Sequence, residues 1–423
     1  MTKPTKNVLY AQAGGVSAVI NASAAGVIET VRQHPQVFGK VYAAINGIKG
    51  VLDEALVDID SFSEQDMARL KFLPGAAFKA CRFDLETEEA RPDQYQRVLE
   101  VFTRYQIGYF FYNGGNGSML TAKKVADYCC RQGHPVICIG VAKTIDNDLA
   151  ISHCSPGFGS TAKYLATSFF EACLDIQSMH QTSTRFFVLE TMGRNVGWLS
   201  LAPGLVKKLL PDLPIIILPA ERPFRRQAFL DKVQKLIDEH GYCTCSVSEG
   251  VRSEDGQFIS VAGVEHAHGM TFTQLGGVAE KLGHLVADQL KIKTHSANPD
   301  YLQRSASHMV SQTDWDMAYQ AGEQAVIAAL NGEHGVLPII TKLSDNPFQF
   351  GFKTVPLDAV AELEKSVPDS FITEDGMDIT QAALDYLLPL VAGERPIAFK
   401  HGMPDISPLQ LTHLTKQLAP FKN

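Results

Sequence analysis

Short apolar runs alternate with stretches of helical spacing along most of the chain, and this alternation limits the folds open to it. The runs are rich in β-branched or aromatic residues, which is typical of strands buried on both faces of a sheet. They cover residues 8–13, 41–45, 107–112, 136–142, 186–189 and 215–218. Apolar residues at i, i+3, i+4 and i+7 steps predict a helix over residues 162–176. Strands that alternate with helices indicate βαβ units and parallel sheets with helices on both faces.

The number of predicted elements is too large for one sheet, and a chain of 423 residues usually forms more than one domain. We therefore expect an α/β protein with two Rossmann-like lobes, each of three layers around a parallel-type sheet. The first lobe is predicted over residues 1–157 and the second over 158–304, without a Pro-, Ser- or Gly-rich linker at the boundary. Residues 305–423 are predicted as a helical and extended C-terminal extension, part of which packs back on the first lobe.

The composition excludes several classes of partner. With 46 acidic and 38 basic residues the formal charge is −8, so no basic excess is present to neutralise a nucleic-acid backbone. The sequence has no stretch of 18 or more apolar residues and no apolar signal core, which predicts a cytoplasmic protein without a membrane partner. The eight cysteines lack C-x-x-C spacing, so we expect reduced, mostly buried side chains and a reducing compartment.

Three junctions between an apolar run and a helix are built from small residues, and each is a candidate phosphate seat. They cover residues 13–17, 113–118 and 155–160. Glycine lets a ligand approach the main chain, and a helix N-terminus offers unpaired N–H groups with a partial positive charge. Neither G-x-G-x-x-G with an acidic ribose ligand nor G-x-x-x-x-G-K-[ST] is present, so neither a dinucleotide fold nor a P-loop is indicated. Taken singly, each junction is also compatible with a simple helix cap.

A charged segment, Lys143-Thr144-Ile145-Asp146-Asn147-Asp148, directly follows the run 136–142. This placement predicts that it lies at the carboxyl edge of a parallel sheet, where α/β proteins bind their ligands. A lysine with two carboxylates supplies an anion contact together with a general base or a metal anchor. If the segment is extended, Asp146 and Asp148 point the same way. A polar turn capped by its aspartates is the alternative interpretation.

Three further motifs combine arginine, glutamate and tyrosine, and together they suit a sugar phosphate. They are Met192-Gly193-Arg194, Ser248-Glu249-Gly250 and Tyr301-Leu302-Gln303-Arg304. Arginine binds phosphate in a bidentate manner, whereas a glutamate beside it is suited to accept hydrogen bonds from hydroxyls. Arg82 and Arg185 stand alone in the sequence, and each is also compatible with an ordinary surface or ion-pairing role.

The order and spacing of these motifs resemble those of the phosphofructokinase family. The shared features are AGGVSAVINA, Arg82-Phe83, GGNGS, KTIDND, TMGR, SEG and YLQR, which together span residues 8–304. The resemblance implies two α/β lobes with the active site in the cleft between them. It also implies a glycolytic phosphotransferase that transfers a phosphoryl group to the 1-hydroxyl of fructose 6-phosphate and forms fructose 1,6-bisphosphate.

The resemblance assigns roles to individual residues. Asp146 is the expected general base, and the other members of the catalytic set are Lys143, Thr144, Asp148 and Arg194. The residues expected to bind fructose 6-phosphate are Thr144, Ile145, Asp146, Arg185, Met192, Gly193, Arg194, Glu249, Tyr301 and Arg304. Those expected at the phosphates of the donor are Gly14, Gly15, Arg82, Gly115, Gly117, Ser118 and Lys143. Arg185 is expected to reach the site of a neighbouring subunit, which implies a homodimer or homotetramer.

Mg²⁺ is the cofactor that the resemblance implies, with Asn116 as its protein contact. The family usually has an aspartate at this position, and asparagine offers a carbonyl oxygen without the formal charge. We therefore expect Mg²⁺ to arrive mainly with the donor and to contact Asn116 directly or through water.

Two markers disagree about the phosphoryl donor, because members of the family use either ATP or pyrophosphate. By the resemblance, Lys143 favours pyrophosphate, since a lysine there stabilises the leaving phosphate. Gly117 favours ATP, because pyrophosphate users usually carry an aspartate whose carboxylate occupies the place of the α-phosphate. We expect pyrophosphate, since the start of the chain and the long segment after Arg304 look more like that branch.

Three alternatives stay open. The first is an ATP-dependent enzyme that uses the space at Gly117. The second is a non-catalytic regulatory paralogue, against which the presence of Asp146 argues. The third is a kinase of the related GGDGT type that acts on a lipid or on NAD, in which YLQR and MGR would have no role.

Overall fold

The structure is a computed structural model that describes residues 5–267, 270–361 and 363–422. Its contacts divide the chain into two compact units, which we call unit 1 and unit 2. Unit 1 comprises residues 1–158, 304–364 and 393–423, and unit 2 comprises residues 159–303 and 365–392. The stretch 305–423, which we expected as one C-terminal extension, is thus divided between the two units.

Unit 1 contains a seven-stranded sheet in the order β13-β12-β5-β4-β1-β2-β3. The strands are β1 (Lys6–Gln12), β2 (Phe38–Ala44), β3 (Leu56–Asp58), β4 (Ile107–Gly114), β5 (Ile137–Ala142), β12 (Val336–Asp345) and β13 (Phe348–Pro356). The five central strands are parallel, whereas β3 and β13 at the edges run antiparallel to their neighbours. The predicted parallel sheet is therefore confirmed for the strands that carry the sequence motifs.

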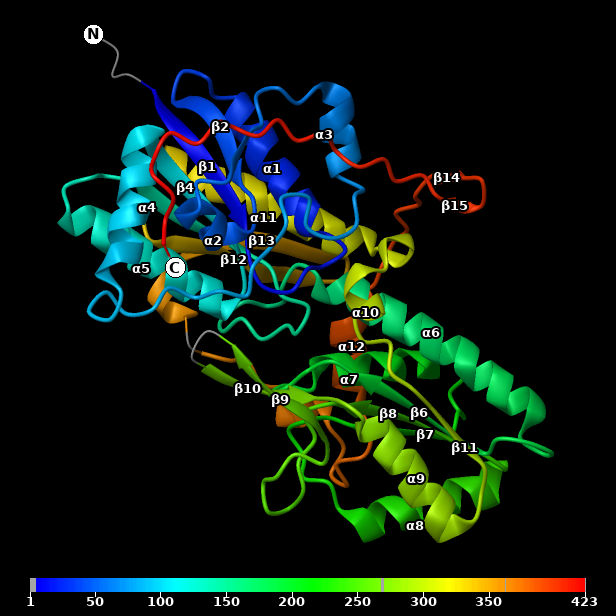
Figure 1. Cartoon of the computed structure of the whole chain (residues 1–423). Helices are drawn as coiled ribbons and strands as arrows, with labels where there is room; N and C mark the ends of the chain where they lie inside the picture. The colour runs from blue at the N-terminus through cyan, green and yellow to red at the C-terminus, as the bar shows by residue number, and fades with distance from the viewer. Residues whose placement is uncertain (1–4, 268–269, 362, 423) are drawn as a thin grey trace. The chain divides into compact units, whose positions relative to one another are not determined.

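Helices cover both faces of this sheet, because successive strand residues enter different apolar cores. In β1, Leu9 and Ala11 belong to one core, and Val8 and Tyr10 belong to the other. The first core is closed by α2 (Gly47–Leu52), α4 (Pro92–Arg104) and α5 (Asn116–Arg131). The second is closed by α1 (Ile20–Arg32), α3 (Glu64–Leu70) and α11 (Gln312–Leu330). Unit 1 thus has the three layers that the buried runs predicted (Figure 1).

The C-terminal part of the chain contributes to unit 1 through α11, which packs closely on α1. A Cβ atom on Gly26 would lie 2.1 Å from the carbonyl oxygen of Tyr319, and one on Gly322 would lie 2.2 Å from that of Ser23. Glycine at both positions is therefore what lets the two helices approach. The remaining elements of unit 1 are the 3₁₀ helices Ser307–Met309 and Leu357–Ala359 and the short hairpin β14 (Phe399–Lys400) and β15 (Met403–Pro404).

Unit 2 contains a four-stranded parallel sheet in the order β11-β6-β8-β7. The strands are β6 (Phe186–Thr191), β7 (Ile215–Leu218), β8 (Cys243–Ser248) and β11 (Thr294–Ala297). One face is covered by α8 (Arg226–His240) and α9 (Val278–Leu290). On the other face lies α6 (Phe158–Met179), whose Phe169 ring is 6.3 Å from that of Phe187. The helix predicted over residues 162–176 falls within α6.

Short elements complete unit 2. They are α7 (Trp198–Leu201), α10 (Leu302–Ser305) at its boundary with unit 1, the hairpin β9 (Val261–Ala267) and β10 (Met270–Leu275), α12 (Gln381–Leu390), and the 3₁₀ helices Ala202–Lys208 and Asp369–Phe371. The segment 365–392 joins this unit through specific contacts. The indole N–H of Trp198 donates to the carbonyl oxygen of Lys365 at 2.7 Å, and its ring lies 5.2 Å from that of Tyr386. These contacts depend on residues far apart in sequence, so local spacing did not predict them.

Among the described residues, which include all eight cysteines, no disulfide is formed, and six of the cysteines are buried, as the sequence predicted for most of them. None of the helices that the structure describes combines the length and hydrophobicity that a membrane crossing requires.

Candidate active site

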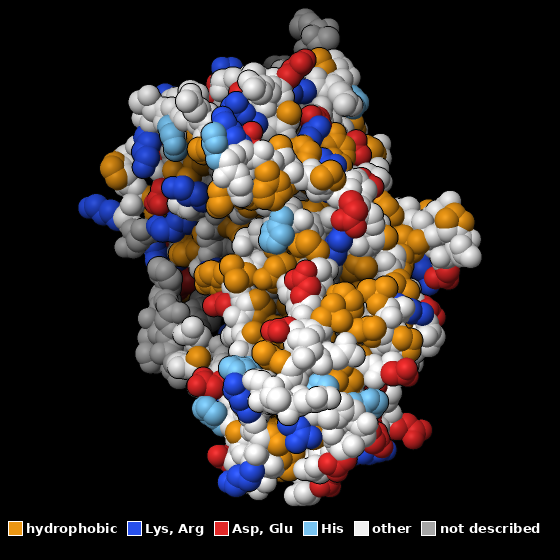
Figure 2. Space-filling view, turned by 90° about the vertical axis from the view of Figure 1, so that its right-hand side faces the viewer, with side chains coloured by type: hydrophobic (Ala, Val, Ile, Leu, Met, Phe, Trp, Pro, Cys, Tyr) orange, Lys and Arg blue, Asp and Glu red, His pale blue; other side chains and the backbone are white. Residues whose placement is uncertain are grey.

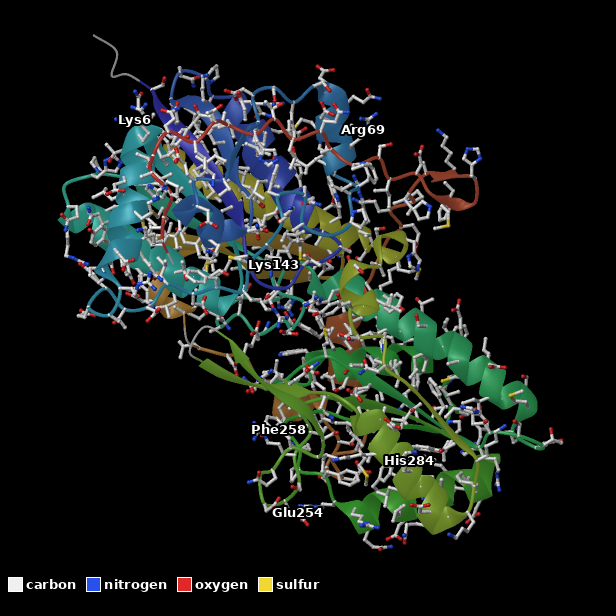
Figure 3. The ribbon with its side chains drawn as sticks, in the orientation of Figure 1. Lys6, Arg69, Lys143, Glu254, Phe258 and His284 are labelled. Carbon is white, nitrogen blue, oxygen red and sulfur yellow. The ribbon has the colours of Figure 1, made fainter. Side chains whose placement is uncertain are left out.

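The loop after β1 and the lysine after β5 meet at the carboxyl edge of the unit 1 sheet (Figure 3 labels Lys143). The ammonium of Lys143 donates to the carbonyl oxygen of Gly15 at 2.5 Å. A Cβ atom on Gly14 would lie 3.3 Å from Nζ of Lys143, and one on Gly15 would lie 2.8 Å from Nη1 of Arg304. Two cationic groups therefore lie over this loop, and at Gly14 a positive φ of 72° also favours glycine.

Lys143 is 4 % exposed, and its surroundings change its acidity. Burial lowers the pKa of its ammonium from 10.5 to about 8, and the neighbouring cations Arg304 and Arg82 act in the same direction. The carboxylates of Asp146 and Asp148 oppose this shift. The site therefore holds a buried cation close to its own titration range, which is the kind of group that an anionic ligand stabilises.

The segment that carries the two aspartates is a turn and not an extended strand, so the condition under which Asp146 and Asp148 would point the same way is not met. Asn147 between them has a left-handed φ of 58°, and its side-chain oxygen accepts from the backbone N–H of Ser155 at 3.0 Å. The hydrogen bond stabilises the turn. The residue type favours it as well, because asparagine adopts a left-handed conformation more readily than most residues. The side chain of Ile145 is buried beside Gly157, so Ile145 presents only its main chain to a ligand.

Thr144 links the two aspartates. Its hydroxyl oxygen accepts from the backbone N–H of Asp146 at 3.1 Å, and the hydroxyl donates to the carboxylate of Asp148. Burial raises the pKa of Asp148, and the hydrogen bond from Thr144 opposes that shift. Asp146 is partly exposed, as a group that reacts with an incoming substrate needs to be.

Asn116 and Asp148 together offer two oxygen atoms that fit a hard divalent cation. The amide nitrogen of Asn116 donates to Oδ2 of Asp148 at 3.2 Å. Within the described part of the chain, Oδ1 of Asn116 and Oδ1 of Asp148 are buried without a hydrogen-bond partner. Buried oxygens without a partner are costly, and Mg²⁺ prefers oxygen ligands. No group of three or more His, Cys, Asp or Glu side chains suited to a metal was found among the described residues.

The N-terminus of α5 lies beside the same segment. The backbone N–H of Lys143 donates to the carbonyl oxygen of Gly114 at 3.1 Å, and Gly115 precedes the first turn without a side-chain cap. The first-turn residues Asn116, Gly117 and Ser118 therefore present backbone N–H groups to a ligand. A Cβ atom on Gly114 would lie 2.1 Å from the Ser118 hydroxyl oxygen, so glycine is required where β4 meets α5.

Arg82 lies next to the loop after β1, because the residue before it is hydrogen-bonded to that loop. The N–H of Gly14 donates to the carbonyl oxygen of Cys81 at 2.9 Å, and the Arg82 side chain that follows is exposed. All the residues expected at the donor phosphates thus belong to unit 1, around the ends of β1, β4 and β5.

In unit 2, the loops after β6 and β8 are tied together around Gly193. Its backbone N–H donates to the carboxylate of Glu249 at 3.1 Å, and its carbonyl oxygen accepts from the hydroxyl of Ser248 at 2.7 Å. A Cβ atom on Gly250 would lie 2.1 Å from the carbonyl oxygen of Arg194. Burial raises the pKa of Glu249, and the hydrogen bond from Gly193 opposes that shift. The MGR and SEG motifs therefore form one rigid edge of the sheet.

Gln303 is a residue of this edge that the sequence analysis did not single out. Its side-chain oxygen accepts from the backbone N–H of Met192 at 3.1 Å. Its amide nitrogen is buried and has no hydrogen-bond partner within the described chain. The only feature of the sequence that could have pointed to Gln303 was its position within the YLQR motif. Tyr301 of the same motif is 62 % exposed, and Arg304 belongs to unit 1, where its guanidinium lies over Gly15.

Arg185 lies apart from the other residues expected to bind the sugar phosphate. It precedes β6, whereas Met192, Gly193 and Arg194 follow the opposite end of that strand. At about 3.3 Å per residue, the two ends of the strand are roughly 20 Å apart. The side chain of Arg185 donates to the carbonyl oxygen of Gly241 at 2.8 Å. Unit 2 therefore does not bring Arg185 to the edge formed by MGR and SEG.

Comparison with known proteins decides the family. The model of the family described as phosphofructokinase matches residues 7–329 of the chain. The chain belongs to the phosphofructokinase family. Among its relatives, the pyrophosphate–fructose 6-phosphate 1-phosphotransferase of Halomonas elongata is 46 % identical over 98 % of this chain and 99 % of the relative. The protein of the same name from Methylococcus capsulatus is 44 % identical over 98 % of each chain.

A solved phosphofructokinase has nearly the same fold. The crystal structure of the pyrophosphate-dependent phosphofructokinase from Nitrosospira multiformis is matched with a TM-score of 0.91 and 43 % sequence identity, over 99 % of this chain and 100 % of that one. The α/β fold with two units is therefore the phosphofructokinase fold that the sequence motifs predicted.

Proposed function

We propose that this phosphofructokinase transfers a phosphoryl group from pyrophosphate to the 1-hydroxyl of fructose 6-phosphate and forms fructose 1,6-bisphosphate. The observation that carries the proposal is the buried ammonium of Lys143, which lies over Gly14 and donates to Gly15 in the glycine loop. A buried cation at a main-chain anion seat suits a small, highly charged leaving group. The names of the relatives from Halomonas elongata and Methylococcus capsulatus support pyrophosphate as that donor.

In the proposed reaction, Asp146 acts as the general base. The 1-hydroxyl oxygen of the sugar attacks the terminal phosphorus of pyrophosphate while its proton passes to the carboxylate of Asp146. The bond to the other phosphate breaks, and that phosphate leaves with the electron pair. Lys143 and Arg82 stabilise its negative charge. Gly14, Gly15, Gly115, Gly117 and Ser118 hold the donor through the main chain and the first turn of α5.

Mg²⁺ is the proposed cofactor, and Asn116 and Asp148 would hold it through the two buried oxygens that have no hydrogen-bond partner. When bound, it neutralises charge on the phosphoryl oxygens during transfer. Asn116 lacks a formal charge, so part of the coordination sphere must come from the donor and from water.

The sugar phosphate is proposed to contact residues at the ends of the unit 2 strands. Met192, Gly193 and Arg194 surround the sugar and the transferred phosphoryl group, and Glu249 accepts from sugar hydroxyls. Tyr301 of unit 2 and Arg304 of unit 1 bind the 6-phosphate. The hydrogen bonds that tie Gly193 to Glu249 and to Ser248 support this proposal, because they hold the loops in one conformation.

We also propose that the enzyme works in glycolysis in the cytoplasm and as a homo-oligomer. Arg185 lies at the opposite end of β6 from the other sugar-phosphate residues, so it suits the site of a neighbouring subunit. Hydrophobic side chains are exposed on the face shown in Figure 2. In the β14–β15 hairpin, Phe399 and Met403 are 60 % and 68 % exposed, and such groups are suited to contact another copy.

The experiment that tests the function supplies pyrophosphate and ATP in parallel, with fructose 6-phosphate and Mg²⁺, and measures fructose 1,6-bisphosphate. We expect turnover with pyrophosphate. Asp146→Asn should lower kcat by about 10²–10⁴-fold while calorimetry still detects fructose 6-phosphate binding. An active Asp146→Asn variant would exclude this base. Turnover with ATP alone would exclude the proposed donor, and no turnover with either would favour the regulatory alternative.

A further inference from the structure

Four glycines lie in the donor seat, the set of residues expected at the donor phosphates. Three of these glycines have a charged side chain beside the position that a Cβ atom would take, and the charges differ in sign. The positions that Cβ atoms would take on Gly14 and Gly15 face Lys143 and Arg304, which are cationic. The corresponding position on Gly117 faces the carboxylate of Asp84, with Oδ1 at 3.5 Å and Oδ2 at 3.7 Å. The seat thus has a positive side at the loop after β1 and a negative group at the first turn of α5.

Asp84 reaches this place from a different part of the chain. It follows Arg82 in the segment between α3 and α4, 33 positions before Gly117, and its side chain is exposed. No hydrogen bond or ion pair to its carboxylate was found among the described residues. The carboxylate is therefore not required to hold another part of unit 1, and its charge acts on whatever occupies the seat.

The space beside Gly117 is consequently not open to an anion. A pyrophosphate has only two phosphoryl groups, which Lys143 over Gly14 and the first-turn N–H groups of α5 can accept. A nucleoside triphosphate carries a third phosphoryl group and a nucleoside, which have to extend beyond these contacts. Where that extension passes the first turn of α5, it meets a negative charge at close range, and the two repel each other.

We propose that Asp84 is a donor-specificity residue, whose carboxylate over Gly117 disfavours nucleoside triphosphates and so selects the shorter pyrophosphate. The inference rests on the proposed function, because it concerns the donor of that reaction. It also explains how Lys143 and Gly117, which point to different donors, coexist in one chain. The acidic group beside α5 comes from residue 84 and not from residue 117.

The test compares kcat/KM for pyrophosphate and for ATP in the wild type, Asp84→Asn and Asp84→Ala. Asp84→Asn removes the charge at nearly constant shape, and we expect the ratio of ATP to pyrophosphate efficiency to rise about tenfold. Asp84→Ala also removes bulk and should raise the ratio further. The matched control is Glu89→Gln, which removes one negative charge from an exposed side chain five positions along the same segment. The control should keep the wild-type ratio.

A rescue variant sharpens the test. In Asp84→Ala/Gly117→Asp the carboxylate moves to the neighbouring position, and we expect the donor ratio to return toward that of the wild type. An unchanged ratio in Asp84→Asn would overturn the inference, as would an equal rise in Glu89→Gln.

Calorimetry with Mg·ATP separates this inference from the proposed function. Failure of the wild type to use pyrophosphate would overturn the function. Even in that case, an Asp84→Asn variant that binds ATP about tenfold more tightly than the wild type would support the inference that Asp84 disfavours ATP. Equal affinities in the two proteins would overturn the inference whatever the turnover.

Discussion

At the scale of single residues, Lys143 makes the most direct prediction. Burial lowers the pKa of its ammonium to about 8, so the charge is present below pH 8 and is lost as pH rises through that value. If Lys143 stabilises the leaving phosphate, kcat/KM for pyrophosphate should fall above about pH 8, because this parameter follows the ionisation of the free enzyme.

The check is the pH profile of kcat/KM for the wild type and for Lys143→Arg. Arginine stays charged throughout this range, so the fall at alkaline pH should move to higher pH in the variant even if its absolute activity is lower. An alkaline limb at the same pH in both proteins would show that another group titrates there.

At the scale of elements, Glu190 connects the end of β6 to two segments of unit 2. Its carboxylate accepts from the backbone N–H groups of Gly277 and Ala279, at 3.1 and 2.9 Å, where α9 begins. It also accepts from the side chain of Asn298 at 3.2 Å. Gly277, which directly precedes α9, has a left-handed φ of 83°, a conformation that favours glycine. Glu190 is 2 % exposed, so these bonds are shielded from water.

Glu190→Gln tests this connection. Glutamine puts an N–H₂ group where one of the acceptor oxygens stood, and we expect the free energy of unfolding to fall by about 1–3 kcal/mol. The KM for fructose 6-phosphate should rise more than kcat falls, because Tyr301 follows Asn298 by three positions. Urea unfolding and steady-state kinetics measure the two effects. The control Glu280→Gln, on the exposed side of α9, should cost less than about 1 kcal/mol and leave the KM unchanged.

At the scale of the whole molecule, the position of Arg185 predicts shared sites. Arg185→Ala should lower activity about 10–100-fold, since hydrogen bonds to charged groups are worth about 1.5–3 kcal/mol. Consider a hybrid dimer of one Arg185→Ala chain and one Asp146→Asn chain. If each site takes Arg185 from the neighbouring subunit, one of the two sites in this dimer contains both native residues. Hybrids purified through two different tags should therefore show about half of the wild-type activity per dimer. Hybrids no more active than the parent variants would place Arg185 outside the neighbouring site.

The sequence by itself determined the layers of the fold, the family and most of the candidate site. Strand runs are buried on both faces, so their local composition is enough to reveal them. Polar motifs that follow such runs must lie at the carboxyl edge of a parallel sheet, which is why residues 143–148 and 192–194 could be placed in advance. Glycines at those junctions were recognisable for the same reason.

Only the tertiary structure decided which of these groups meet. The left-handed turn at Asn147 depends on its bond to Ser155, and the acceptor for the N–H of Met192 is Gln303, 111 positions away. The segment 365–392 joins unit 2 through Trp198 and Tyr386, and the carboxylate beside Gly117 comes from Asp84. Each of these contacts joins segments that local spacing treats as independent. The chain has to fold before their geometry, and with it the charge pattern of the donor seat, exists.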